Sequence, residues 1–462
     1  MLFGRMLGAL AVAASVGVVG VMQPSAGAQQ AASAQNQPAV ALQTVVPAQV
    51  APRQFPAQLT DTPVAPPNTD AMRLAGIAKD NSRRFGSDPD DPGPLAKDLS
   101  PALTPIAVGA AMRKVADWQL GQSQEYFAVV DKARNLDGRI WTWAVLYTGY
   151  MAAAQSLDEP KYRVAMEQMS KSYNWELRSK LPGGDDQVLG QTYLELYLLE
   201  KKPEQLAATR AALDAVLAAP RVELGGSQRI AWWWCDALFM APPTWARMYA
   251  ATGDRKYITY LDEEWAKTDK SLYDAQEHLY ARDATFVGKT EKNGRKIFWS
   301  RGEGWVMGGL ARTLEYLPKD DAARTKYETQ LGEMASAVAK IQGKDGLWRS
   351  GLLDPASYDQ PEVSGSALIV YGLAWGVNNG VLDRKSYEPV IAKAWAGILQ
   401  HIYADGRLGD LQQTGAQPAT FKPSASYNYG VGGFLLAGSE VRKLAASEAG
   451  ASQQKPVAHQ KK

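Results

Sequence analysis

The sequence predicts an all-α fold built from paired helices. Aliphatic and aromatic residues recur at three- and four-residue spacing, as in Tyr193, Leu196 and Tyr197, which is typical of helices with a buried face. Continuous β-branched runs are nearly absent, and short strands are expected only around Arg295–Phe298 and Gly346–Trp348. Twelve helices are expected, beginning near residues 104, 138, 159, 185, 203, 233, 255, 303, 320, 364, 384 and 428.

A weak internal repeat indicates how these helices pair. At four places a helix ends, a polar turn follows, and a Lys-Tyr or Ser-Tyr pair opens the next helix, at Tyr162, Tyr257, Tyr327 and Tyr387. The uneven spacing excludes a solenoid of fixed period, but the pattern is typical of helical hairpins with an inner and an outer helix. Six such hairpins would close into an α/α toroid, and an irregular helical domain remains the alternative from periodicity alone.

Composition narrows the class of protein. The chain has 462 residues, 46% of them hydrophobic, which is enough for a substantial core. Its length alone suggests about two or three domains, but a helical barrel can use such a chain as one unit. The formal net charge is only +2, and the one basic block is Lys461-Lys462 in the tail. We therefore expect no nucleic-acid partner, and the sequence does not define an oligomeric state.

The first 28 residues have the pattern of a secretory signal peptide. Arg5 precedes an apolar run from Met6 to Met22, and a small-residue site that ends at Ala28 follows. Cleavage is expected after Ala28, which would make the mature protein secreted or periplasmic. Because no cysteine lies near this site, a lipid-anchored form is not supported, and no stable membrane anchor is expected after the signal is removed.

Three further segments follow the signal peptide. Residues 29–98 form an extension that is rich in Ala, Gln, Pro, Val and Thr and then turn-rich, and we expect it to be a disordered linker with order beginning near Leu99. Residues 99–446 carry the predicted helices and would form one catalytic domain. Residues 447–462 are expected to be a disordered polar tail.

The stretch from Trp232 to Tyr257 holds the first candidate for chemistry. Three tryptophans and the only cysteine, Cys235, precede Asp236, which is the only charged residue between Arg229 and Arg247. A lone carboxyl group among aromatic side chains should be partly desolvated, which raises its pKa and suits a general acid. The alternative is that Asp236 only caps the helix that it opens. The cysteine is interpreted as buried packing, because no histidine is near it in sequence.

Six segments would line one mouth if the inner helices all start at the same end of a toroid. Each is an aromatic- or acid-marked loop before an apolar helix, and they span residues 139–143, 183–187, 232–236, 299–305, 362–366 and 427–433. The second segment contains Asp185 and Asp186, of which one could cap its helix while the other faces Asp236. We slightly favour Asp186 as the second catalytic carboxylate, with Asp185 in contact with the substrate.

Other residues could bind a sugar. Arg301 lies between Trp299 and Trp305 on a glycine-rich loop, and arginine binds carboxylates bidentately while indole rings stack on sugars. The structural alternative for Arg301 is an ion pair with Glu303.

Weaker candidates for substrate contacts each have a structural alternative as well. A tryptophan can equally belong to the core, a lone histidine is more often a structural hydrogen-bonding group, and an arginine can pair with the acid that follows it. These candidates are Trp141, Trp143, Trp233, His278 and Arg282.

The sequence contains no pattern for a cofactor or a metal. It has no dinucleotide- or phosphate-binding glycine motif and no GxSxG motif. Only three histidines occur, and no His, Cys and carboxylate cluster has metal-ligand spacing. We therefore expect neither a metal nor a cofactor.

Five motifs carry a resemblance to a known family that extends from about residue 100 to 445. They are DDQVLGQTYLELY, WCDALFMAPPTWARMYAATGDRKY, FWSRGEGWVMGGLARTLEYLP, SGSALIVYGLAWGVNNGVL and GVGGFLLAGSEV. Together they resemble glycoside hydrolase family 105, the unsaturated rhamnogalacturonyl hydrolases. The resemblance implies an (α/α)6 barrel with a catalytic acid at Asp236, one site residue in the Asp185-Asp186 pair, and sugar contacts from Trp299 and Arg301.

The chain departs from the family's pattern at two positions. Glu303 stands where Asn is usual, and Arg282 stands where some members carry His. Both departures bear on the substrate linkage more than on the acid–base assignment.

The resemblance also implies a substrate and a reaction. The substrate is an unsaturated uronic acid at the non-reducing end of a pectin or rhamnogalacturonan lyase product. Protonated Asp236 would donate a proton to C4 of the enol ether, water would attack C5 with the help of Asp186, and the hemiketal would open to release the aglycone. The alternatives are hydrolysis of glycosaminoglycan- or ulvan-type unsaturated glucuronyl products, and a non-catalytic carbohydrate-binding toroid that would tolerate Asp236→Asn.

Overall fold

The computed structural model describes residues 86–131, 136–178, 183–219 and 230–453. The chain divides into two units, and all of these residues belong to the second, Pro67–Lys462. The predicted signal peptide, the predicted linker up to residue 85 and the last nine residues of the tail lie outside the described residues.

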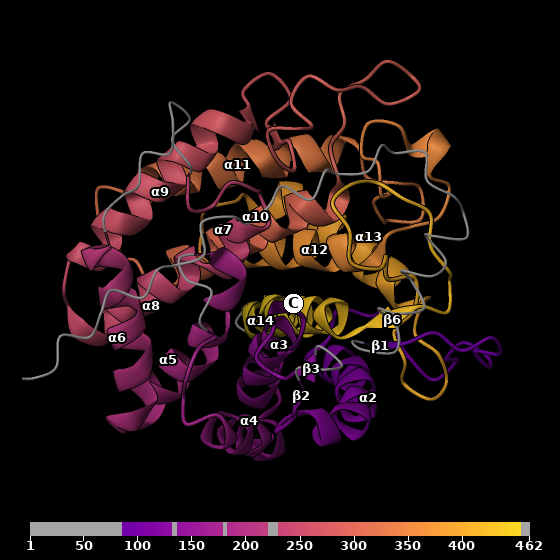
Figure 1. Ribbon diagram of the computed structural model, residues 1–462. Coiled ribbons are helices and arrows are strands. Elements are labelled where there is room, and N and C mark those ends of the chain that lie inside the picture. The colour runs from indigo at the N-terminus through magenta and orange to yellow at the C-terminus, as the bar shows by residue number, and fades with distance from the viewer. Residues whose placement is uncertain (1–85, 132–135, 179–182, 220–229, 454–462) are drawn as a thin grey trace, which may run out of the picture. The chain divides into compact units, whose positions relative to one another are not determined.

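Twelve helices of the described chain form six hairpins (Figure 1). The inner helices are α3 (Trp141–Leu157), α5 (Leu189–Glu200), α8 (Pro242–Thr252), α10 (Ser300–Leu314), α12 (Val363–Asn378) and α14 (Asn428–Gln453). The outer helices are α4 (Pro160–Ser172), α6 (Glu204–Ala218), α9 (Lys256–Leu272), α11 (Arg324–Lys340), α13 (Arg384–Leu399) and α2 (Pro105–Ser123). Each inner helix contacts the next around the ring, and α14 contacts α3, so the ring closes as an (α/α)6 barrel. This confirms the predicted fold and the predicted order of helices.

The sequence of the inner helices explains why they are enclosed. Every residue from Ser300 to Leu314 in α10 and from Val363 to Val377 in α12 is buried. A helix without a polar face must be covered on all sides, whereas a helix with one apolar stripe can lie against the ring with its other face in water. The outer helix α9 is of the second kind, with Leu261 and Trp265 buried and Lys256 exposed.

The Lys-Tyr repeat in the sequence has a structural cause. At three outer helices, the lysine and the tyrosine of the pair both bind one aspartate of the preceding outer helix. In α9, the Tyr257 hydroxyl donates to Asp214 Oδ1 at 2.7 Å, and Lys256 Nζ lies 3.1 Å from the same oxygen. The same arrangement joins Lys161 and Tyr162 to Asp117, and Lys326 and Tyr327 to Asp262. The repeat therefore ties neighbouring outer helices to each other.

Small residues set the distance between two inner helices. A Cβ atom added at Gly432 in α14 would lie 2.5 Å from the Val145 carbonyl oxygen in α3. One added at Gly149 would lie 2.8 Å from the Cα atom of Gly432. The helices can approach this closely only because both positions are glycine.

The described chain contains three short two-stranded sheets. They pair β1 (Gly86–Ser87) with β6 (Ser426–Tyr427), β2 (Val130–Asp131) with β3 (Leu136–Asp137), and β4 (Tyr273–Asp274) with β5 (Leu279–Tyr280). The strands expected around Arg295–Phe298 and Gly346–Trp348 do not form. The first segment has only an isolated bridge from Lys296 to Thr290, and the second has none within it.

Residues 86–98, which the sequence places in the disordered extension, pack against the end of the barrel domain. Gly86 and Ser87 pair with β6, and Asp88 Oδ1 lies 3.2 Å from Lys422 Nζ. Arg407 also donates a hydrogen bond to the carbonyl oxygen of Pro92. The expectation that order begins near Leu99 is therefore wrong, because these backbone and charge contacts fix the segment from Gly86 onward.

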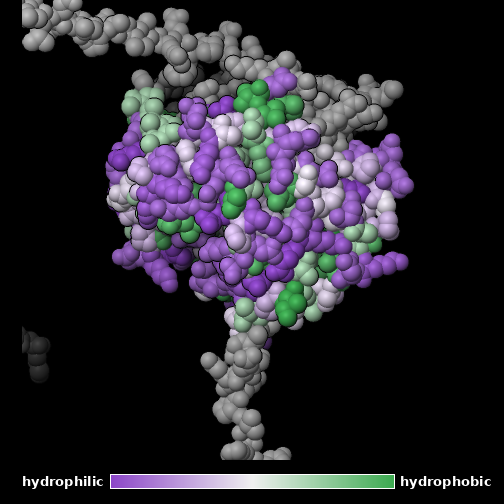
Figure 2. Space-filling model, turned by 90° about the horizontal axis from the view of Figure 1, so that it is seen from below, coloured by the Kyte–Doolittle hydropathy of each residue, from purple (hydrophilic) through white to green (hydrophobic). Residues whose placement is uncertain are grey.

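Polar residues predominate on the face of the molecule shown in Figure 2, and apolar residues there form small separate patches. Within the described ranges, no helix is both long enough and apolar enough to cross a bilayer.

The Lys-Tyr contact predicts a position-dependent effect of removing a hydroxyl group. Tyr257→Phe should lower the free energy of unfolding by about 1 kcal/mol, because a hydrogen bond to a carboxylate is lost. Tyr387→Phe is the matched control, because this tyrosine belongs to the Ser-Tyr version of the repeat and its hydroxyl makes no hydrogen bond within the described residues. Thermal unfolding measures both variants, and equal shifts in midpoint would contradict the explanation.

Candidate active site

The N-terminal ends of the inner helices meet at one end of the barrel. The Trp141 ring at the start of α3 lies 5.1 Å from the Tyr429 ring of α14 and 6.1 Å from the Trp305 ring of α10. The Trp305 ring also lies 5.0 Å from that of Phe239 in the short helix α7 (Ala237–Met240), which precedes α8. The loops before these helices therefore share a mouth, as predicted.

Asp236 directly precedes α7 and is held in the mouth. Its side chain makes no capping hydrogen bond to the helix, so the alternative of a simple cap is not supported. Its Oδ2 atom lies 3.4 Å from Arg282 Nε and 3.5 Å from Cys235 Sγ. The backbone here is fixed, because the Cys235 N–H donates to the Arg282 carbonyl oxygen at 2.8 Å.

Asp185 is the second acid that the structure brings to Asp236. It lies in a 3-10 turn (Gly184–Asp186) that packs on α7, where a Cβ atom added at Gly184 would lie 3.1 Å from the Ala237 Cβ. Burial of the carboxyl group, followed by the negative charges of Asp236 and Asp186, raises the pKa of Asp185 to about 7. The Asp185 side chain is nevertheless partly exposed, as a group that meets a ligand must be.

Asp186 is engaged elsewhere. Its side chain is buried, and its Oδ1 atom accepts a hydrogen bond from Arg178 Nη1 at 3.1 Å. The sequence slightly favours Asp186 over Asp185 as the partner of Asp236, whereas in the structure Asp185 is the more exposed of the two acids. Two adjacent acids in one turn cannot be distinguished from the sequence, because their exposure and contacts depend on how the turn folds.

Arg282 lies at the exposed edge of the same site. Its Nη1 atom donates to Asp283 Oδ2 at 2.8 Å, and its guanidinium carbon lies 5.5 Å from the centre of the Trp233 ring. The Trp233 side chain is 51% exposed, so this ring keeps a free surface next to the acids. Both are among the predicted contact residues, and the structure brings them together with Asp236.

Arg301 does not have the environment expected of a ligand-binding arginine. It is 1% exposed, and its Nη1 and Nη2 atoms donate to the carbonyl oxygens of Gln412 and Gln413 at 2.8 and 2.7 Å. Trp299 lies under its guanidinium group and donates to the Gln412 side chain. In this structure, Arg301 and Trp299 hold the loop before α14.

The predicted tryptophan platforms divide into two groups. Trp143, Trp299 and Trp305 are buried at 4% exposure or less, so packing explains them. The Trp143 ring, for example, stacks on Tyr126 at 5.4 Å. Only Trp141, which is partly exposed, and Trp233 can offer a ring face to a ligand in this structure.

His278 lies on the turn between β4 and β5, away from the pair of acids. Its Nδ1 atom is 2.9 Å from the Tyr273 hydroxyl and 3.5 Å from Glu333 Oε2. These contacts fit the structural alternative considered for this histidine.

Glu303 is a feature of the site that the sequence does not assign. It is fully buried in the first turn of α10, and both of its carboxyl oxygens accept the Tyr280 N–H, at 2.9 and 3.1 Å. Burial and the nearby charge of Asp236 raise the pKa of Glu303 well above its ordinary value. Its ion pair with Arg301, one of the readings of the sequence, does not form.

Arg178 is also missed by the sequence, because it lies in a loop without a motif. It joins the mouth by two contacts, with Asp186 and, through Nε, with Asp137 Oδ2 at 3.4 Å.

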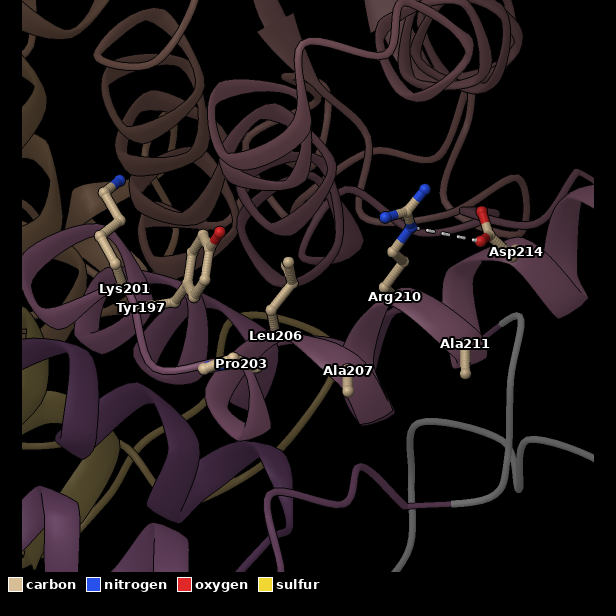
Figure 3. Close-up of a pocket in the computed structure, with 8 residues that line it drawn as sticks. All are labelled: Tyr197, Lys201, Pro203, Leu206, Ala207, Arg210, Ala211 and Asp214. Atoms are coloured by element: carbon tan, nitrogen blue, oxygen red, sulfur yellow. Dashed lines mark ion pairs between the residues drawn. The ribbon is translucent and has the colours of Figure 1, made fainter.

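Within the described residues, no group of three His, Cys, Asp or Glu side chains is arranged to hold a metal ion. A surface pocket of about 440 Å³ lies between α5 and α6 (Figure 3). Its lining residues, which include Tyr197, Lys201 and Arg210, contain none of the acids of the mouth.

The sequence model of Glycosyl Hydrolase Family 88 matches residues 111–445. The chain belongs to this family. Solved structures of possible family 105 members share the fold, and the resemblance drawn from the motifs is confirmed.

Individual relatives agree with this membership. An unsaturated 3S-rhamnoglycuronyl hydrolase of Formosa agariphila is 40% identical over 352 residues, which cover 73% of this chain and 91% of that protein. A family 88 structure from Bacteroides vulgatus is 31% identical, with a TM-score of 0.66 over 74% of this chain and 99% of its own. A structure described as a polysaccharide lyase is also 31% identical, with a TM-score of 0.67 over 74% of this chain and 98% of its own. The protein is therefore a glycoside hydrolase.

The raised pKa of Asp185 predicts a pH-dependent effect on stability. A carboxyl group whose pKa rises from 3.8 to about 7 on folding costs stability as the pH rises through that interval, because the folded protein must give up a tightly held proton. Asp185→Asn should therefore raise the unfolding midpoint relative to wild type by more at pH 8 than at pH 4.

The control for this experiment is Asp186→Asn. It breaks the hydrogen-bonded ion pair with Arg178 and should lower the unfolding midpoint at pH 8. An Asp185→Asn effect of the same size at both pH values would show that this carboxyl group is not the one that holds the proton.

Proposed function

We propose that this glycoside hydrolase releases a 4,5-unsaturated uronic acid from the non-reducing end of oligosaccharides made by polysaccharide lyases. The observation that carries the proposal is the pair of acids in the barrel mouth, Asp236 and Asp185, of which Asp185 has a pKa of about 7. Such a pair holds a proton at neutral pH that it can give to a substrate. Family membership and the names of the relatives fit the same reaction.

The reaction needs one proton donor and one proton acceptor. We assign Asp236 as the acid that contacts C4 and Asp185 as the partner that shares its proton. The π electrons of the C4–C5 double bond form the new C4–H bond, and the positive charge is shared by C5 and the ring oxygen. Water attacks C5, and its proton returns to the now fully ionised pair. The hemiketal then opens at the C5–O5 bond, and the hemiacetal left at C1 releases the aglycone.

This assignment explains why the site holds several acids near few cations. An acid that donates a proton must keep it in the resting enzyme, and neighbouring negative charge makes it do so. The carboxylate spacing rule of ordinary glycosidases does not apply, because no displacement occurs at the anomeric carbon.

The names of the relatives favour a rhamnoglycuronyl substrate over the rhamnogalacturonan product that the motifs imply. The relative that is 40% identical is named for a 3S-rhamnoglycuronyl group, whereas the motifs imply rhamnogalacturonan products. We therefore propose an unsaturated uronyl group linked to a rhamnose of the 3S-rhamnoglycuronyl type as the first substrate to test, followed by the rhamnogalacturonan disaccharide.

The central test follows the ultraviolet absorbance of the conjugated enol ether with purified protein and each unsaturated disaccharide. Wild type should remove the absorbance, and Asp236→Asn should lower the rate about 100-fold or more, because the proton donor is lost. Asp320→Asn, an exposed aspartate outside the mouth, should keep the wild-type rate.

Two other results would overturn the proposal. A rise in absorbance from a saturated polysaccharide would indicate a lyase, which creates the double bond. Binding of the disaccharide without any loss of absorbance would indicate a carbohydrate-binding toroid.

We also propose that the chain is exported and cleaved after Ala28, because Arg5, the apolar run from Met6 to Met22 and the small-residue site form a signal-peptide pattern. Expression of the full chain in a Gram-negative host, followed by fractionation and N-terminal sequencing, should recover a periplasmic or secreted protein that begins at Gln29. An intact Met1 in the cytoplasmic fraction would contradict export.

A further inference from the structure

The proposed reaction places a negative charge beside negative charges. The carboxylate of the substrate is bonded to C5, the neighbour of the atom that Asp236 protonates. A substrate in reach of Asp236 therefore brings its carboxylate close to Asp185 and Asp236 as well. Such an arrangement requires a cation with free donors in the mouth. The inference that follows rests on the proposed function.

Two arginines of the mouth are poor candidates for this cation. Arg301 is enclosed by protein and uses both terminal nitrogens on carbonyl oxygens. Arg178 lies between two carboxylates, with Nη1 at 3.1 Å from Asp186 and Nε at 3.4 Å from Asp137. Arg301 is only 1% exposed, and Arg178 faces Asp186 and Asp137 rather than Asp236.

Arg282 differs in where its donors face. Within the described residues, the only hydrogen bond of its side chain runs from Nη1 to Asp283. Its Nε atom lies 3.4 Å from Asp236 Oδ2 without a hydrogen bond to it. The edge formed by Nε and Nη2, which matches the two oxygens of a carboxylate, is therefore directed toward the catalytic acid.

The surroundings hold this guanidinium group in place. Asp283 is fixed by the N–H and hydroxyl groups of Thr285, at 2.8 and 2.6 Å. An isolated bridge joins Asp283 to Trp234, and the exposed Trp233 ring lies next to the guanidinium plane. A cation on an aromatic face is held in a defined orientation.

We propose that Arg282 binds the carboxylate of the unsaturated uronyl group through its guanidinium group. The exposed Trp233 ring supports the guanidinium group during binding. The sugar then lies with C5 next to Arg282 and C4 next to Asp236.

The test compares the unsaturated uronyl disaccharide with its C6 methyl ester, which lacks the negative charge. Wild type should prefer the acid to the ester in kcat/KM. In Arg282→Gln, the KM for the acid should rise about 10- to 100-fold, and the preference should disappear. Arg282→Lys should recover part of the preference, because it keeps the charge but not the bidentate edge.

The matched control is Arg210→Gln, which removes an exposed arginine that pairs with Asp214 in the surface pocket of Figure 3. It should leave the acid-to-ester ratio unchanged. Circular dichroism verifies that Arg282→Gln is folded, and Arg282→Lys replaces it if it is not.

Two results would overturn the inference in distinguishable ways. If Arg282→Gln lowers the rates on the acid and the ester equally, Arg282 acts only by positioning Asp236 and does not bind the carboxylate. If wild type hydrates neither the acid nor the ester of any unsaturated uronide, the proposed function itself fails, and this inference fails with it.

Discussion

The closure of the inner ring is the constraint on which the rest of the structure depends. The inner helices α10 and α12 have no exposed face, so each must be covered by its neighbours and by an outer helix. Once the ring has closed, only the ends of these helices and their preceding loops can meet a ligand. Chemistry is therefore confined to the mouth, and the positions that carry it come from segments far apart in the sequence, such as Asp185 and Asp236.

Confinement in the mouth also determines the electrostatics. The barrel removes water from carboxyl groups that lie close together, which raises the pKa of Asp185 and of Glu303. The negative charge of Asp236 raises both pKa values further. The two acids differ in access, because Glu303 is sealed behind the mouth and Asp185 is partly exposed. Asp185 can therefore exchange its proton with a substrate, whereas the buried Glu303 can act only through its packing and charge.

The sequence predicts the helices and the mouth well, because a helical period and an N-terminal loop are local features. It also points to Asp236, whose lack of charged neighbours is visible in the sequence. The sequence does not predict the role of a residue whose contacts come from distant parts of the chain. The donors of Arg301 are occupied by Gln412 and Gln413, more than 100 residues later, and no local pattern reveals that. The choice between adjacent acids in one turn, and the exposure of individual tryptophans, depend on the same tertiary contacts.

In the proposed mechanism, a proton passes from the acid pair to C4 of the substrate. The most direct measurement is nuclear magnetic resonance of the reaction in D2O, with spectra taken before the released sugar can rearrange. We expect the double bond to disappear as the aglycone is released and one deuterium atom to be present at C4. A released uronic acid that keeps its double bond and has no deuterium at C4 would show direct displacement at the anomeric carbon and would contradict the proposed mechanism.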